Sequence, residues 1–199
     1  MELYQHQKRI LEDSPNKSLL ALDTGLGKSF LALELAKNKE SQPVLIVCPK
    51  ALAKNWEREI GKADFPLRYK VMTKETFRRD WDMLAFHPTI IYDEAHFVAG
   101  LTSQMSKNFY KYLKKWNIPH RYLLTATPYM STPWNIYTLA RHLGYDLGYN
   151  YFKRKFFTEI QMGGRMIPMA RKNMEEELKS IIQNIGYTYT IDECFDVPE

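Results

Sequence analysis

The chain has 199 residues, of which 45% are hydrophobic and 26% are charged. It is long enough for one domain with its own core and too short for two complete α/β domains. This composition excludes a disordered chain, a collagen and a coiled coil. No apolar run approaches the roughly 20 residues that cross a bilayer, and the first residues lack the apolar core of a signal peptide. We therefore expect a soluble, intracellular protein with no membrane partner.

The net charge is +5 at pH 7, which suits a polyanionic partner but is common in other basic proteins. The charges are unevenly distributed. Residues 150–172 carry six cations and one acid, and residues 173–199 carry seven acids and one cation. A basic stretch of this kind is more often a solvated face than a nucleic-acid site, so charge alone leaves both interpretations open.

Short strand-like runs alternate with amphipathic helical stretches along the chain. We predict strands at residues 18–22, 44–48, 69–72, 89–92 and 121–124, and helices at residues 28–38, 52–60, 105–116 and 133–143. This alternation predicts an α/β fold with a mostly parallel central sheet and helices on both faces. Further on, we predict a hairpin around Gly163 and Gly164. A last helix would be capped by Asn173 and closed by Gly186.

A glycine-rich turn, Thr24-Gly25-Leu26-Gly27-Lys28-Ser29, follows the first predicted strand and leads into a predicted helix. Glycines let backbone N–H groups and the helix N-terminus face a phosphate. In such a loop Lys28 reaches the β- and γ-phosphates of a nucleotide, and the hydroxyl of Ser29 ligates Mg²⁺. The common pattern has a glycine five residues before Gly27, where this chain has Leu22. This difference argues against a small-molecule kinase.

Two acidic residues, Asp93 and Glu94, end a later buried strand. They would lie at the carboxyl edge of the sheet, where phosphate-binding loops also lie. Asp93 would hold Mg²⁺ through water, and Glu94 would orient and deprotonate the attacking water. An acidic pair at a strand end is also a common helix cap or solvated turn. Its position 65 residues after Lys28, on a strand of its own, favours the catalytic interpretation.

A threonine-rich segment, Leu124-Thr125-Ala126-Thr127-Pro128, leaves the last predicted strand of the alternating pattern. Its hydroxyls can hydrogen-bond to His96 and so couple the state of a nucleotide to a nucleic acid. Threonine-rich strand ends are also common structural turns, so this signal is weak by itself.

In this order, the segments resemble the first RecA-like lobe of superfamily 2 helicases and translocases, most closely the Swi/Snf-type branch. The resemblance covers about residues 3–145 and consists of five motifs in order. They are the glutamine motif (residues 3–7), motif I (25–29), motif Ia with its following helix (44–60), the Asp-Glu-Ala-His motif II (93–96) and motif III (125–128). It implies a RecA-like P-loop lobe at residues 1–145. Residues 146–199 would form a basic hairpin and helical extension of the same lobe.

The resemblance implies ATP hydrolysis with Mg²⁺, coupled to movement along DNA, in this branch usually duplex DNA. The catalytic residues would be Glu94, Lys28 and Asp93, with Ser29 and Asp93 on the metal. The nucleotide would be held by Gln7, which reads the adenine in preference to Gln5, and by Thr24, Gly25, Leu26, Gly27, Lys28 and Ser29. His96, Thr125 and Thr127 would couple ATP hydrolysis to movement. Pro49, Lys50 and Thr73 would face the phosphate backbone of the DNA strand along which the motor moves, and Lys54 would be a further phosphate contact.

The chain departs from this branch after His96, where Phe97-Val98-Ala99-Gly100 replaces a basic run that carries an asparagine. Gln161-Met162-Gly163-Gly164-Arg165 imitates the arginine-finger motif of a second lobe. Pro168 stands at its last arginine, so we interpret the segment as a hairpin. We therefore expect the second RecA-like lobe, with its arginine finger, to be a separate partner. Because such a finger contributes roughly 10³ to 10⁵ in turnover, we expect this chain alone to be nearly inactive.

Two alternatives stay open. The chain could be the lobe of an RNA helicase or a restriction-type motor, or it could be a nucleotide-gated module that binds nucleic acid without turnover. Trp56 has helical spacing with Leu52 and Ile60, so we interpret it as a core residue. A cytoplasmic location is expected for a bacterial or phage protein, and a nuclear one for a eukaryotic protein.

Overall fold

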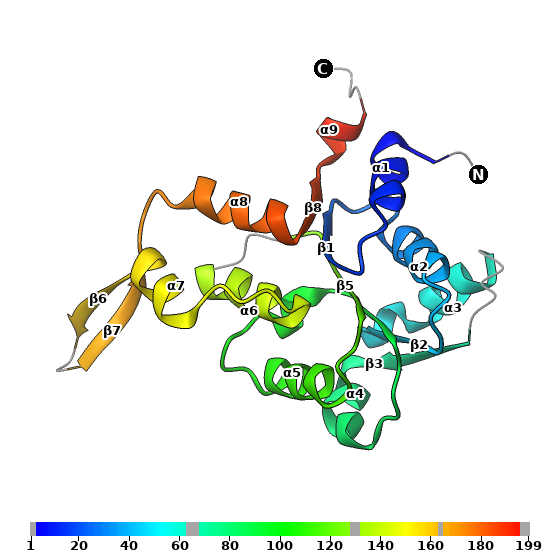
Figure 1. The fold of residues 1–199 in the computed structure, drawn as a ribbon, viewed down its shortest axis with the longest axis horizontal. Helices are drawn as coiled ribbons and strands as arrows, with labels where there is room; N and C mark the ends of the chain where they lie inside the picture. The colour runs from blue at the N-terminus through cyan, green and yellow to red at the C-terminus, as the bar shows by residue number, and fades with distance from the viewer. Residues whose placement is uncertain (1–2, 63–67, 128–131, 163–164, 196–199) are drawn as a thin grey trace.

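The structure is a computed structural model that describes residues 3–62, 68–127, 132–162 and 165–195. Within these residues, one sheet has the strand order β3-β2-β4-β5-β1-β8 (Figure 1). Its strands are β1 (Lys17–Leu22), β2 (Val44–Cys48), β3 (Tyr69–Thr73), β4 (Thr89–Tyr92), β5 (His120–Thr125) and β8 (Gly186–Tyr189). Every neighbouring pair is parallel. The predicted α/β fold with a central parallel sheet is confirmed.

Helices cover both faces of this sheet, as its continuous apolar strands require. One face packs against α4 (Lys74–Asp80), α5 (Gln104–Trp116), α6 (Pro133–Leu143) and α8 (Glu175–Ile185). The other face packs against α1 (Gln5–Asp13), α2 (Lys28–Asn38) and α3 (Ala53–Lys62). Alternate residues of one strand serve the two cores, so Leu19 and Ala21 point to the first and Leu20 and Leu22 to the second.

The chain after α6 forms an arm that projects from the sheet (Figure 1). It consists of α7 (Tyr149–Phe156) and an antiparallel hairpin of β6 (Phe157–Met162) and β7 (Arg165–Ala170). Met162 pairs with Arg165, which confirms the hairpin interpretation, although Gly163 and Gly164 lie outside the described residues. The base of the arm is anchored where the ring of Phe157 stacks on Trp134 of α6, 4.5 Å between centroids.

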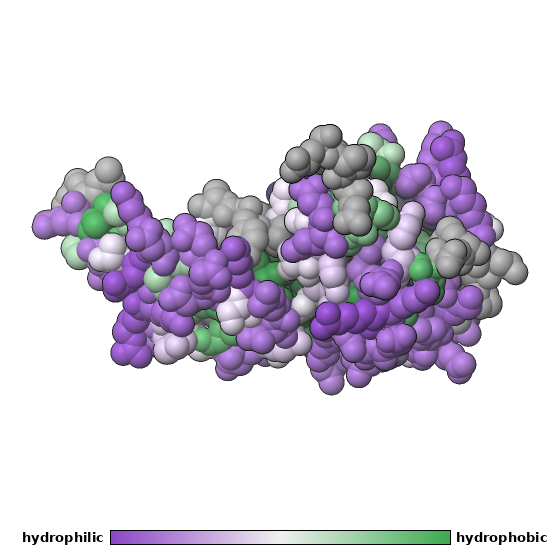
Figure 2. Space-filling model, turned by 90° about the horizontal axis from the view of Figure 1, so that it is seen from above, coloured by the Kyte–Doolittle hydropathy of each residue, from purple (hydrophilic) through white to green (hydrophobic). Residues whose placement is uncertain are grey.

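Part of the basic stretch of the arm has a structural role. Lys153 forms an ion pair with Glu159, at 2.7 Å, and the Nε of Arg171 donates to the carbonyl of Phe157, at 3.1 Å. Figure 2 shows a mostly hydrophilic surface with hydrophobic side chains near the tip of the arm. The exposed hydrophobic residues of β7 are Met166, Ile167 and Met169.

The end of the chain differs from the prediction at two points. Asn173 does not cap α8. The residue before this helix is Met174, which makes no side-chain cap. Asn173 has a positive φ of 58°, which turns the chain before the helix begins. Gly186 does close α8, and it also begins β8, an unpredicted strand beside β1. Only glycine fits there, because a Cβ at Gly186 would collide with the carbonyl of Leu19. No helix among the described residues is long and apolar enough to span a membrane.

Candidate functional site

The glycine loop, residues 24–29, leaves the carboxyl end of β1 and enters α2. Its backbone passes through positive φ at Gly25 (94°) and Gly27 (76°), which glycine adopts without the steric cost of a side chain. Gly27 is the N-cap of α2 and offers no side-chain cap. A Cβ at Gly25 would meet no atom within 4 Å. The first N–H groups of α2 are therefore without a side-chain acceptor, and this is the condition under which a helix N-terminus binds an anion.

Lys28 folds back over the end of β1. Its ammonium donates to the carbonyl of Leu22 at 2.7 Å and to that of Asp23 at 3.0 Å. Partial burial lowers the pKa of Lys28, and the negative charges of Glu94, Asp93 and Asp23 oppose this shift. The fold therefore brings the lysine of the glycine loop within electrostatic range of both acids that the sequence assigned to the same site.

Asp93 follows β4 and is 7% exposed. One carboxylate oxygen, Oδ2, accepts a hydrogen bond from the indole Nε1 of Trp56 at 2.8 Å, and the other, Oδ1, accepts from the backbone N–H of Glu94 at 3.0 Å. Burial raises the pKa of Asp93, and the hydrogen bond from Trp56 opposes that rise. The interpretation of Trp56 as a core residue is correct but incomplete, because this buried side chain also orients the carboxylate.

Glu94 has a left-handed backbone, with φ 55° and ψ 58°, and begins the short 3-10 turn Ala95–Val98. A non-glycine residue in this region carries strain of roughly 1–3 kcal/mol, which is often found at functional sites. Its Oε2 lies 3.1 Å from Nδ1 of His96, but the two atoms lack the alignment of a hydrogen bond. The side chain of Glu94 is about one-third exposed and so remains accessible to a water molecule.

The threonines of motif III are close in sequence to the site but make a local contact. Oγ1 of Thr125, which is fully buried, accepts from the backbone N–H of Thr127 at 3.1 Å. Among the hydrogen bonds of the described residues, none joins His96 to either threonine. Their coupling role stays a prediction, and Pro128 lies outside the described residues.

The glutamine motif reaches the glycine loop from α1. Gln7 is buried, its Nε2 donates to the carbonyl of Leu26 at 3.2 Å, and its Oε1 accepts from the backbone N–H of Tyr4 at 3.1 Å. A Cβ at Gly27 would lie 2.6 Å from Nε2 of Gln7, so the close approach of this amide also requires glycine there. Gln5 is exposed. Gln7 is therefore the glutamine that contacts the loop, and adenine recognition by it stays a prediction.

The last described segment also contacts the start of this region, a contact that was not predicted. The backbone N–H of Asp23 donates to the carbonyl of Tyr189 at 3.1 Å, and Oδ2 of Asp23 accepts from the N–H of Ile191 at 3.0 Å. Ile191 begins the short helix α9 (Ile191–Cys194). The end of β8 and the start of α9 thus fix Asp23, the residue before the glycine loop. The only sequence signal was the short Gly-Tyr-Thr-Tyr run after α8, which lacks aliphatic residues.

The residues expected to meet DNA follow the carboxyl ends of β2 and β3, which are neighbours in the sheet. Pro49 precedes the 3-10 turn Lys50–Leu52, and Lys50 and Lys54 are exposed. Thr73 has a structural role, since its Oγ1 caps α4 by accepting from the N–H of Thr76 at 3.2 Å. The fold therefore places these residues along the same edge as Asp93, and their contact with DNA stays a prediction.

The chemistry of the donor set fits a magnesium nucleotide. The described residues contain no cluster of three or more His, Cys, Asp or Glu side chains that could hold a metal ion. Mg²⁺ is usually bound by one or two protein oxygens together with substrate phosphates and water, in place of an all-protein cage. The hydroxyl of Ser29 and the carboxylate of Asp93 could supply such a partial set of ligands, with an anion on the glycine loop supplying others.

These features define a RecA-like α/β lobe whose glycine loop and acidic pair meet at the carboxyl edge of a parallel sheet. No protein-family model matches the chain. In sequence, the chain is 29% identical over 157 residues to the SWI/SNF-related matrix-associated actin-dependent regulator of chromatin subfamily A-like protein 1 homolog of Caenorhabditis elegans. The matched region is 67% of this chain and 22% of that relative.

Two solved structures share the fold. The SWI2/SNF2 ATPase core of Sulfolobus solfataricus, solved in complex with double-stranded DNA, superposes with a TM-score of 0.72 at 24% identity, over 98% of this chain and 47% of that one. The Hef helicase domain of Pyrococcus furiosus superposes with a TM-score of 0.59 at 20% identity, over 80% of this chain and 41% of that one. The predicted resemblance to a superfamily 2 lobe of the Swi/Snf type is confirmed. The chain is similar to one lobe of helicase- and translocase-type ATPases and spans less than half of each relative.

Proposed function

We propose that this chain is the ATP-binding lobe of a translocase or helicase that couples ATP hydrolysis to movement on double-stranded DNA, in partnership with a second RecA-like lobe. The observation that carries the proposal is the convergence of Lys28, Asp93 and Glu94 beside an uncapped helix N-terminus. The presence of duplex DNA in the solved Sulfolobus relative supports the choice of partner. A DNA-containing compartment, the cytoplasm of a bacterium or the nucleus of a eukaryote, follows from the same proposal.

Each residue of the edge has a defined task in this proposal. The amides of the glycine loop, with the ammonium of Lys28, bind the phosphates. For this task Lys28 must first leave the carbonyls of Leu22 and Asp23, to which its ammonium donates at 2.7 and 3.0 Å. Mg²⁺ neutralises phosphate charge when it is bound, and Ser29 and Asp93 are the side chains that would hold it.

Glu94 is the proposed general base. Its carboxylate is partly exposed and lies one residue beyond Asp93, so it can accept a proton from a water molecule at the phosphate side of the sheet. His96, Thr125 and Thr127 are the proposed coupling residues because they lie at or beyond the carboxyl ends of the neighbouring strands β4 and β5, as Glu94 does. The arginine finger of a second lobe would complete the charge stabilisation.

The test is ATP hydrolysis with a second RecA-like lobe supplied, measured with duplex DNA, single-stranded DNA or duplex RNA. The proposal expects hydrolysis that is stimulated most by duplex DNA. Stimulation by RNA alone would assign the lobe to an RNA helicase. Tight ATP binding without single-turnover hydrolysis would instead favour a nucleotide-gated binding module. Absence of nucleotide binding would refute all three readings.

A further inference from the structure

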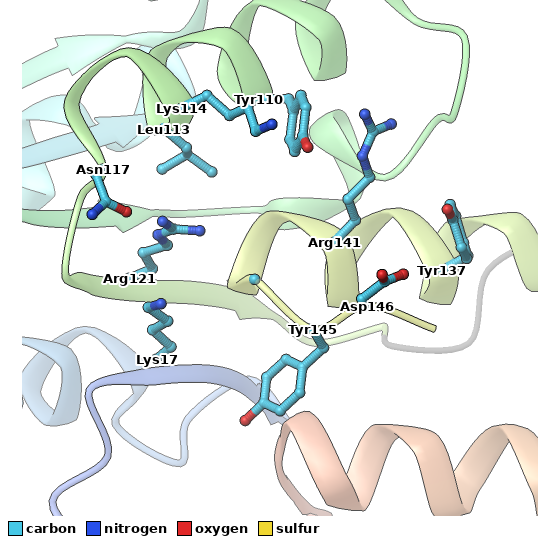
Figure 3. Close-up of a pocket in the computed structure, with 11 residues that line it drawn as sticks. Lys17, Tyr110, Leu113, Lys114, Asn117, Arg121, Tyr137, Arg141, Tyr145 and Asp146 are labelled. Atoms are coloured by element: carbon cyan, nitrogen blue, oxygen red, sulfur yellow. The ribbon is translucent and has the colours of Figure 1, made fainter. Parts of the chain in front are cut away.

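A cavity of about 490 Å³ lies at the amino edge of the sheet, opposite the glycine loop. Figure 3 shows the side chains that line it. It opens where β1 and β5 begin and where α5 and α6 end. Its charged lining consists of four cations and one acid, namely Lys17, Lys114, Arg121, Arg141 and Asp146. Three tyrosines, Tyr110, Tyr137 and Tyr145, also line it. Its volume lies in the range of small-molecule sites, about 300–1,000 Å³.

The sheet itself brings two of these cations together. Lys17 and Arg121 are register partners in the parallel pair β1 and β5, so their side chains leave the same face side by side. Nζ of Lys17 and Nη1 of Arg121 lie 3.4 and 3.5 Å from the position that a Cβ of Gly144 would take. Burial lowers the pKa of Lys17, and the neighbouring positive charge of Arg121 lowers it further. Like charges held side by side repel each other.

Arg121 also has a structural role, but that role does not explain the rest of the cluster. It is 7% exposed, its Nε donates to the carbonyl of Ile118, and its Nη1 donates to that of His142, each at 2.8 Å. Among the ion pairs of the described residues, none joins Lys17, Lys114 or Arg141 to a carboxylate. The one acid of the lining, Asp146, uses its Oδ1 to accept from the N–H of Gly148 at 2.9 Å.

The opposite wall of the cavity is built around Tyr110. The guanidinium of Arg141 lies 3.8 Å from the centre of its ring, and the ammonium of Lys114 lies 5.7 Å from it. Burial alone would raise the pKa of Tyr110, but hydrogen bonds and charge from Arg141 and Lys114 lower it. This tyrosine therefore keeps both cations beside the cavity while supplying a polar hydroxyl and an apolar ring.

We propose that this cavity binds a phosphate-bearing small molecule. Two guanidinium and two ammonium groups against one carboxylate leave an excess of three positive charges, which a multiply charged oxyanion balances better than a single carboxylate does. Guanidinium groups pair well with phosphate oxygens. The tyrosine rings leave room for the uncharged part of such a molecule. The cationic groups gather around one hollow and do not form a line along the surface, which favours a small ligand over the continuous backbone of a nucleic acid. The site lies apart from the proposed nucleotide site and does not depend on it.

The probe is inorganic pyrophosphate, titrated calorimetrically into the chain in the background Lys28→Ala, so that binding at the glycine loop does not contribute. The test variant adds Lys17→Gln and Arg141→Gln to this background. Arg121 is left intact because its bonds hold the carbonyls of Ile118 and His142. The matched control carries Arg58→Gln and Lys62→Gln on α3, which is the same change of charge on the far face of the sheet. Circular dichroism checks that each variant is folded.

We expect saturable pyrophosphate binding in the background protein and in the control. In the test variant the dissociation constant should rise at least tenfold. Absence of binding at millimolar pyrophosphate, or equal binding in the test variant and the control, would overturn the proposal. A short DNA duplex is titrated in parallel. If the duplex displaces pyrophosphate and itself loses affinity in the test variant, the cavity is a nucleic-acid contact and the small-molecule proposal fails.

Discussion

At the carboxyl edge of the sheet, the ammonium of Lys28 is balanced by the nearby charges of Asp93 and Glu94. At the amino edge, Lys17 and Arg121 stand side by side, and no ion pair of the described residues joins either of them to a carboxylate. The two ends of the same strands therefore differ in charge balance. We propose that the first binds a metal together with an anion and that the second binds an anion alone.

This difference has an energetic side. Asp93 is buried beside Glu94, which favours its protonated form, and the indole of Trp56 and the ammonium of Lys28 partly compensate. The amino edge has no comparable compensation for Lys17. Both edges thus retain charged groups in positions that do not favour stability, as expected where side chains are kept for binding.

The largest expected effect is on turnover at the carboxyl edge. Glu94→Gln keeps the size of the side chain and removes the proposed base. With a second lobe supplied, hydrolysis should fall by about 10² to 10⁴-fold while ATP binding is unchanged, because general-base catalysis contributes about that factor. The control is Glu57→Gln, the same change on the exposed surface of α3. Retained hydrolysis in the Glu94 variant would remove this residue from the base role.

The next effect concerns the indole that orients Asp93. Trp56→Phe removes the donor to a buried carboxylate, and leaving such an acceptor unpaired costs about 1–3 kcal/mol. We expect the free energy of unfolding, measured in urea, to fall by about that amount plus the cost of the smaller ring. Trp116→Phe is the matched control, because the buried Nε1 of Trp116 has no hydrogen-bond partner among the described residues.

The same pair of variants separates packing from positioning. If Trp56 orients the metal-binding carboxylate, Trp56→Phe should also weaken the dependence of nucleotide affinity on Mg²⁺, whereas Trp116→Phe should leave it unchanged. Equal effects of the two substitutions on stability and on Mg²⁺ dependence would show that Trp56 contributes packing alone.

A third prediction concerns pH. Because burial raises the folded-state pKa of Asp93 above its ordinary value of 3.8, the folded protein retains this proton to a higher pH than the unfolded chain does. Stability from this group is therefore complete below that ordinary value and is lost as the pH rises through the raised folded-state pKa. Asp93→Asn cannot lose a proton. The free energy of unfolding of Asp93→Asn, relative to that of the wild type, should therefore increase as the pH rises from about 4 to 7. A constant difference in urea titrations across this range would contradict the assignment.

The smallest effect is expected at the amino edge. Lys17→Gln removes one member of the like-charged pair and should raise the free energy of unfolding by about 0.2–1 kcal/mol at low salt, the usual size of an interaction between charges near the surface. The gain should shrink at high salt, where the repulsion in the wild type is screened. Lys62→Gln on α3 breaks an exposed ion pair with Glu59 and should give no gain. A loss of stability in Lys17→Gln would show that this lysine makes favourable contacts.

The predictable parts of this molecule are those that depend on neighbours in sequence. Buried parallel strands such as Val44–Cys48 read as continuous apolar runs. The glycine loop is a local passage from strand to helix, and Pro133 and Gly144 mark the ends of α6 as expected. The local signal was misleading at Asn173. This residue turns the chain before α8, and no side chain caps that helix.

The unpredicted parts depend on which strands become neighbours. The bond between Trp56 and Asp93 joins residues 37 positions apart and requires the helix after β2 to lie against the end of β4. The pairing of Lys17 with Arg121 requires β1 and β5 to be adjacent in a particular register. The hydrogen bonds that join Asp23 to Tyr189 and Ile191 require β8 to pair with β1 in the sheet. Periodicity and propensity contain no information on strand order, so none of these contacts could be read from the sequence.

The measurement that tests the central claim most directly is a calorimetric titration of this chain with ATP and Mg²⁺. For the binding that requires Mg²⁺, we predict saturation, a loss of at least tenfold in affinity for Lys28→Ala, and an unchanged affinity for Lys17→Gln at the opposite edge. Absence of heat with any adenine nucleotide, or equal affinity of the wild type and Lys28→Ala, would contradict the assignment of the carboxyl edge as a nucleotide site.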